Sequence, residues 1–138
     1  MQVTIHQKNQ AVHFEAQNDK QQSIQIDGAP SVGGEGKGMR PMEALLGALG
    51  TCTAIDLVDI LRKQRQEISD LKIDVKGERK EGKAPSPFTA IRMNFILEGK
   101  LDSHKVERAV ELSVNKYCSV KESLDPNIEV TYTIEIQN

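Results

Sequence analysis

The sequence contains no tryptophan and few other aromatic residues, with three phenylalanines and two tyrosines among its 138 residues. This scarcity argues against a surface on which nucleic-acid bases would stack. An excess of positive charge is also missing, because 18 lysines and arginines stand against 20 aspartates and glutamates and the formal net charge is −2. We therefore expect no nucleic acid or other polyanion among the partners.

Long hydrophobic runs are missing as well. No apolar run approaches the roughly 18 residues that a membrane span needs, so we expect no membrane partner. The segment Met1–His6 has neither a basic head nor an apolar stretch, which predicts that there is no signal peptide. These observations predict a cytoplasmic protein, in which two cysteines would be reduced at rest.

Common phosphate, metal and hydrolase motifs are absent. The segment Gly33–Met39 is rich in glycine, but Gly38 is followed by methionine and arginine where a phosphate-binding loop needs lysine and then serine or threonine. We therefore expect a flexible turn there. No pair of histidines or cysteines has the spacing of zinc ligands, and the Gly-x-Ser-x-Gly elbow of serine hydrolases does not occur. We expect neither a metal nor a cofactor.

A single stretch dominates what is present. Pro41 suits the first turn of a helix, and no proline follows until well beyond residue 61. The sequence predicts a helix over residues 42–61 that is apolar almost all round and hence buried. Gly47 and Gly50 would each cost about 1 kcal/mol in a helix interior, so we expect another backbone to pack closely against them.

The remaining chain alternates between short strand patterns and one amphipathic helix. We predict a helix that is capped by Ser103, begins near His104 and reaches Cys118, with a short helical continuation to Leu124. Period-two alternation predicts strands at residues 2–6, 11–16, 23–27, 71–77, 88–99 and 128–136. The order indicates an α+β fold rather than a βαβ repeat, in one domain over residues 1–138.

The two cysteines are the candidate reactive groups. Two readings stay open from the residues alone: buried core cysteines that behave as small apolar side chains, or a reactive pair. Cys118 is flanked by Lys116 and Lys121, which favours a thiolate. Asp56 lies one helical turn beyond Cys52 and would oppose a thiolate there.

A family resemblance favours the reactive pair. The segment from Arg40 through Pro41 and Glu43 to Cys52 resembles the helix of the OsmC/Ohr family (osmotically inducible protein C and organic hydroperoxide resistance protein), which has a Pro-Glu start, small residues and then cysteine. The segment 117–120 resembles that family's second cysteine motif, and the likeness is greatest to the YhfA-like branch. The resemblance implies an OsmC-like fold, with antiparallel sheets around a long buried central helix. It also implies an intertwined homodimer with its sites at the subunit interface.

The resemblance also implies a function, a cysteine-based hydroperoxide peroxidase that acts in oxidative stress defence. Cys52 would attack a hydroperoxide and become a sulfenic acid, Cys118 would resolve it as a disulfide, and an external dithiol would reduce the pair. The alternative is a non-catalytic, small-ligand-binding or redox-sensing member of the family.

Two positions depart from the family pattern. The family's catalytic glutamate directly follows the proline, where this chain has Met42. Glu43 lies nine residues before Cys52, roughly 180° around an ideal helix. The family's catalytic arginine lies upstream of the proline, and no arginine precedes Arg40 here. Arg40 is therefore the candidate to stabilise a thiolate, and the candidate catalytic set is Cys52, Cys118, Arg40 and Glu43.

Overall fold

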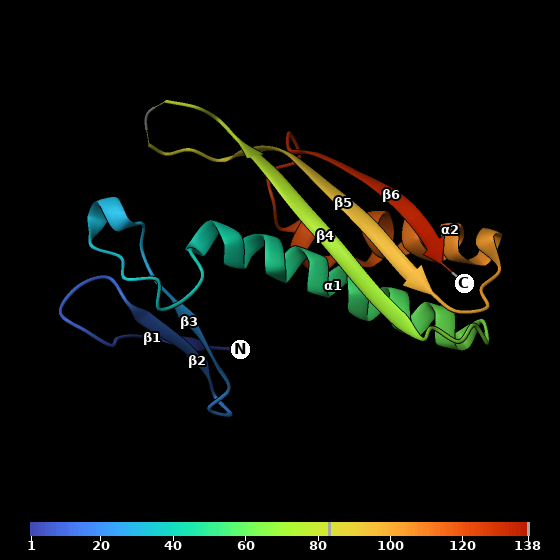
Figure 1. Cartoon of the computed structure of the whole chain (residues 1–138), viewed down its shortest axis with the longest axis horizontal. Coiled ribbons are helices and arrows are strands. Elements are labelled where there is room, and N and C mark those ends of the chain that lie inside the picture. The colour runs from blue at the N-terminus through green and yellow to red at the C-terminus, as the bar shows by residue number, and fades with distance from the viewer. Residues whose placement is uncertain (83, 138) are drawn as a thin grey trace. The chain divides into compact units, whose positions relative to one another are not determined.

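The computed structural model describes residues 1–82 and 84–137. It has a mixed α+β fold with two small sheets (Figure 1). The chain divides into two compact units, Met1–Leu45 and Leu46–Asn138, which are considered in turn.

The N-terminal unit is built on a three-stranded antiparallel sheet. Its strands follow the order β1 (Val3–Gln7), β2 (Phe14–Asn18) and β3 (Ser23–Ile26), so all three predicted strands are confirmed. β2 begins later than the predicted residue 11 because the Asn9 Oδ1 atom accepts the N–H groups of Ala11 and His13 and holds these residues in a turn.

The glycine-rich loop that follows is fixed around one buried carboxylate. Asp27 is 2% exposed. Its Oδ1 atom accepts the Gly28 N–H at 2.8 Å, and its Oδ2 atom accepts the N–H groups of Glu35 and Lys37, each at 3.0 Å. The prediction of a flexible turn is therefore wrong. A Cβ atom at Gly34 would collide with the backbone of Gly28, so the loop needs glycine there to close around Asp27.

The same hydrogen bonds set the acidity of Asp27. The N–H groups of Lys37 and Glu35 lower its pKa from the ordinary 3.8, and burial opposes them only in part. Because the folded-state pKa is the lower one, Asp27 stabilises the loop fully above about pH 4 and loses this effect as the pH falls through the lowered value.

We expect the Asp27→Asn variant to loosen the loop at neutral pH. Losing a charged acceptor weakens its hydrogen bonds, so the amides of Glu35 and Lys37 should exchange with solvent roughly tenfold faster. Hydrogen exchange followed by NMR measures this, with Asp19→Asn on the exposed β2–β3 turn as the matched control. Unchanged exchange at both amides in Asp27→Asn would contradict this account of the loop.

The long predicted helix is α1, Pro41–Lys63. The Glu43 Oε1 atom accepts the backbone N–H of Arg40 at 3.0 Å, one half of a capping box at the helix start. At the other end Arg65 adopts a left-handed conformation with φ 58°. The Arg65 and Gln66 N–H groups donate to the carbonyls of Arg62 and Leu61, which closes the helix in a Schellman motif.

Only one face of α1 is buried within the chain. Its buried residues are Leu49, Gly50, Thr53, Leu57 and Leu61. The predicted burial on almost every side is therefore wrong for a single chain, because Gly47, Ala48, Thr51 and Ile55 are exposed, with Ile55 at 65%. A Cβ at Gly50 would press on the Val75 side chain of β4, whereas one at Gly47 would meet open space. Close packing therefore explains Gly50 alone.

By length and composition α1 could also cross a membrane, so the expectation that no segment would be apolar enough is wrong. The core helices of globular domains have the same length and composition. The contacts of α1 are those of a core helix: Gly50 approaches β4, and the Thr53 hydroxyl lies 3.9 Å from the Met93 sulfur of β5.

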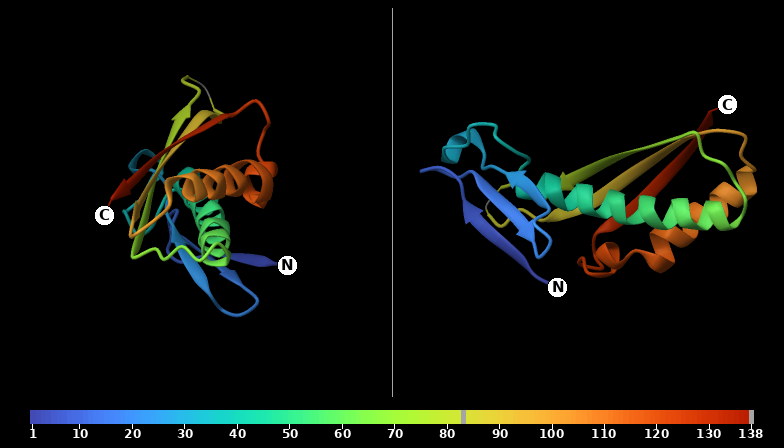
Figure 2. Two further views of the ribbon diagram at one scale, coloured as in Figure 1. Left: turned by 90° about the vertical axis from the view of Figure 1, so that its right-hand side faces the viewer. Right: turned by 90° about the horizontal axis from the view of Figure 1, so that it is seen from below.

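The C-terminal unit is a three-stranded sheet with helices on one face (Figure 2). The strands follow the order β4 (Asp70–Arg79), β5 (Phe88–Glu98) and β6 (Glu129–Gln137). The predicted strands are confirmed, but the expectation of antiparallel sheets fails for one pair, because β5 and β6 are parallel. A parallel pair needs a crossover connection, and α2 (Ser103–Leu112) supplies it.

The segment between α2 and β6 differs most from its prediction. α2 is capped by Asp102, whose Oδ1 atom accepts the Lys105 N–H, and not by Ser103. After Leu112 the chain forms one π-helical turn, η2 (Ser113–Tyr117), and then leaves the helix at Cys118. The predicted helix through Cys118 is therefore wrong. A short helix, α3 (Ser119–Glu122), follows.

Candidate active site

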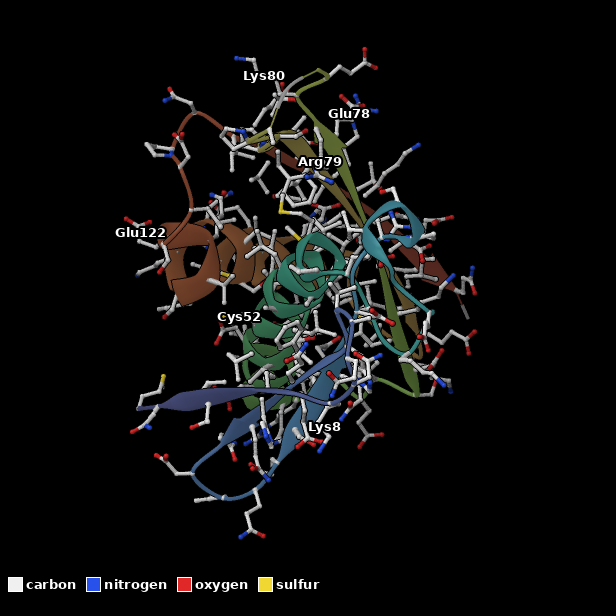
Figure 3. The ribbon with its side chains drawn as sticks, turned by 90° about the vertical axis from the view of Figure 1, so that its left-hand side faces the viewer. Lys8, Cys52, Glu78, Arg79, Lys80 and Glu122 are labelled. Carbon is white, nitrogen blue, oxygen red and sulfur yellow. The ribbon has the colours of Figure 1, made fainter. Side chains whose placement is uncertain are left out.

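Cys52 lies midway along α1, at the border between its two faces. It is a free thiol and half-buried. Its neighbour Thr53 is buried toward the sheet, and its neighbour Thr51 is exposed. Figure 3 labels Cys52 on α1 and Glu122 at the end of α3. Because Cys52 lies between the buried and the exposed face of α1, its side chain is accessible both to other residues of the chain and to a molecule from solvent.

Cys118 is held by the break between two helices. Its backbone is extended (φ −73°, ψ 103°), and its side chain caps α3. The Sγ atom accepts the Lys121 N–H at 3.3 Å, and the residue is 5% exposed. The extended conformation thus fixes a buried sulfur in one orientation.

The two cysteines lie near each other although they are far apart in the sequence. Burial raises the pKa of Cys118 most, the N–H of Lys121 partly offsets this, and the neighbouring Cys52 raises it further. Cys118 therefore stays a thiol at neutral pH.

Arg40 and Glu43, the other two candidate residues, are brought together at the start of α1. Both are exposed, and the carboxylate of Glu43 is occupied by the backbone N–H of Arg40. Among the described residues, the Glu43 carboxylate therefore acts as a helix cap. Glutamate is favoured at the third position of a helix, which is where the Arg-Pro-Met-Glu sequence places it.

Asp56 is a further polar group on the helix that carries Cys52. Its Oδ2 atom is buried and has no hydrogen-bond partner among the residues that the structure describes. Sequence reasoning found Asp56 from its spacing to Cys52. It missed the Lys121 N–H on Cys118, because a backbone donor leaves no mark in the sequence.

Comparison with known proteins gives a consistent result. Residues 34–133 match the family model described as OsmC-like protein. Protein YhfA of Escherichia coli K12 is 44% identical over 101 residues, which cover 72% of this chain and 75% of that protein.

Solved structures agree over nearly the whole chain. A hypothetical protein from Aquifex aeolicus VF5 superposes with a TM-score of 0.80 at 33% identity, over 99% of this chain and 97% of that one. An organic hydroperoxide resistance protein OsmC from Legionella pneumophila superposes with a TM-score of 0.71 over 98% and 97% of the two chains. Its identity is 12%, so this second likeness shows a shared fold alone.

Proposed function

Because this chain belongs to the OsmC-like protein family, we propose that it is a thiol-dependent hydroperoxide reductase that uses Cys52 and Cys118 as a redox pair in oxidative stress defence. The observation that carries the proposal is that the two cysteine side chains lie near each other. Two structural neighbours that share the fold are named as organic hydroperoxide resistance proteins.

The first step takes place at Cys52, which is the more exposed sulfur of the pair. Its thiolate attacks one oxygen of a small organic hydroperoxide, the O–O bond breaks, and the other oxygen leaves with the organic group and takes up a proton as the alcohol. Cys52 is then a sulfenic acid. The two electrons that the peroxide gains come from this sulfur.

The second step uses Cys118. Its sulfur attacks the sulfenic sulfur, the S–O bond breaks, and the hydroxide leaves as water with the proton of Cys118. This closes a disulfide between the two residues. An external dithiol then reduces the pair by exchange and becomes a disulfide itself.

The proposal extends to assembly and location. The exposed apolar face of α1 (Gly47, Ala48, Thr51 and Ile55) is unusual for a helix in contact with water. A homodimer that covers this face would place the neighbouring Cys52 at the subunit interface. A cytoplasmic protein would keep both thiols reduced between turnovers.

A second candidate function is redox sensing without turnover. The use of Glu43 as a helix cap favours it, because the candidate carboxylate is then committed to the fold. A sensor would form the same disulfide but would consume one equivalent of hydroperoxide and then stop, even with excess dithiol present.

The test of the proposal is one equivalent of an organic hydroperoxide added to the reduced protein. We expect two thiols to be lost together and the mass to fall by about 2 Da, since a disulfide forms with loss of two hydrogens. Repeated consumption with excess dithiol distinguishes the reductase from the sensor. Retention of both thiols after the addition would refute both functions.

A further inference from the structure

A row of polar side chains crosses the face of the C-terminal sheet that lies opposite its helices (Figure 2). Lys76 of β4 pairs with Arg92 of β5, and Arg92 pairs with Thr131 of β6. We call these three residues the Lys76 row. All three are exposed, whereas Val75 and Met93, their neighbours along the strands, contact α1 on the other face. Because neighbouring strands lie about 4.8 Å apart, the three side chains share one small area of surface.

Two positive charges stand directly opposite each other in this row. Like charges in that position destabilise an antiparallel pair. Arg92 has a partner, since its Nη2 atom lies 3.3 Å from the Glu78 Oε1 atom. Asp74, the acid on the other side of Lys76 along β4, is paired with Lys72 at 3.3 Å. In the described part of the chain Lys76 is therefore a cation without an ion pair, which an anion from solvent could neutralise.

The next row of the same face satisfies its own hydrogen bonds. The Thr133 hydroxyl donates to the Asn94 Oδ1 atom at 2.7 Å, and the Asn94 Nδ2 atom donates to the Glu135 Oε2 atom at 2.7 Å. Within residues 1–82 and 84–137, the Thr131 hydroxyl and the Lys76 ammonium have no such partner. Both rows line a hollow of about 280 Å³, a volume that suits a small molecule.

We propose that the Lys76 row binds one phosphate group, either free phosphate or the phosphate ester of a small molecule. Lys76 supplies an ammonium, Arg92 the N–H groups that Glu78 leaves free, and Thr131 a hydroxyl. A phosphate dianion can accept from all three because it carries several acceptor oxygens and about two negative charges. The carboxylates of Glu78 and Asp74 oppose the bound anion, so we expect a dissociation constant in the millimolar range. This site is separate from the two cysteines and does not depend on the proposed function.

Titration with inorganic phosphate, followed by NMR of the backbone amides, tests the proposal. Sodium chloride at the same ionic strength is the blank, because screening alone also moves amide signals. We expect saturable shifts at Lys76, Arg92 and Thr131. Lys76→Gln should weaken binding about fivefold and Thr131→Val about threefold, as the loss of one hydrogen-bond donor implies. Lys105→Gln on α2 changes the net charge equally and should bind as the wild type does.

A second probe identifies the source of the phosphate group. Tighter binding of glycerol phosphate than of inorganic phosphate would support an ester as the ligand, and the reverse order would support free phosphate. Absence of saturable shifts with both probes would overturn the proposal. An equal loss of affinity in Lys76→Gln and Lys105→Gln would overturn it too, because binding would then follow net charge and not this row.

Unfolding in urea separates binding from a structural role of Lys76. In phosphate-free buffer we expect Lys76→Gln to be at least as stable as the wild type, because one of two opposed like charges is removed. A marked loss of stability in this variant would show that the lysine serves the fold, and would contradict the proposal.

Discussion

We expect the Cys52→Ser variant to reduce no organic hydroperoxide above the background of buffer and dithiol. A serine hydroxyl is not ionised at neutral pH and cannot be oxidised to a sulfenic acid, so the variant loses both the nucleophile and the electron donor. The fall in kcat/KM should be on the order of 1,000-fold or more, as for loss of an enzyme's nucleophile. Coupled consumption of hydroperoxide and dithiol measures it.

The matched control is Cys118→Ser, which removes the resolving sulfur and keeps the attacking one. We expect this variant to react once and to stop as a sulfenic acid on Cys52, which a dimedone-type reagent traps and mass spectrometry locates. Normal turnover by Cys52→Ser would refute the assignment of Cys52. Absence of the trapped adduct in Cys118→Ser would refute the peroxidase reading.

The elements with a strong sequence pattern were predictable. α1 was found because it has a proline at its start, no proline inside and an apolar run between polar ends. The alternation of β5 shows in the structure as burial of Ile91, Met93, Phe95 and Leu97. In both cases local periodicity and burial agree, which is the condition for reading structure from one sequence.

The errors concern features that depend on partners distant in the chain. The parallel pairing of β6 with β5 follows from the crossover through α2, and the alternation of β6 is the same in either direction. The exposed apolar face of α1 was predicted to be buried in the core, because a sequence does not show whether such a face is covered by the same chain or by another. Asp27 was missed because three backbone donors, which any residue can supply, make it important.

The candidate site likewise has features that could be predicted from the sequence and features that could not. The adjacency of Cys52 and Cys118 was expected from the family resemblance and not from spacing, since two strands, a helix and a π-helical turn lie between them. The role of Cys118 as the cap of α3 could be recognised only in the structure, because its Sγ atom accepts the backbone N–H of Lys121.

The second large effect concerns assembly. Ile55 is 65% exposed and lies on the same face of α1 as Ala48 and Thr51. If this face forms a homodimer interface, a charge at position 55 would be buried without a partner, which is costly. We expect the wild type to be a dimer at micromolar concentration and Ile55→Lys to be a monomer by light scattering.

Lysine is chosen because it disturbs the helix least. Its helix propensity is at least that of isoleucine, and Asp59, one turn further along α1, is already paired with Lys63 at 2.7 Å. Ile55→Leu, which keeps the apolar area, should remain a dimer. If the wild type were a 15.3 kDa particle at every dilution, the dimer proposal would fail. If instead Ile55→Lys stayed dimeric, the interface would have to lie on another face of the chain.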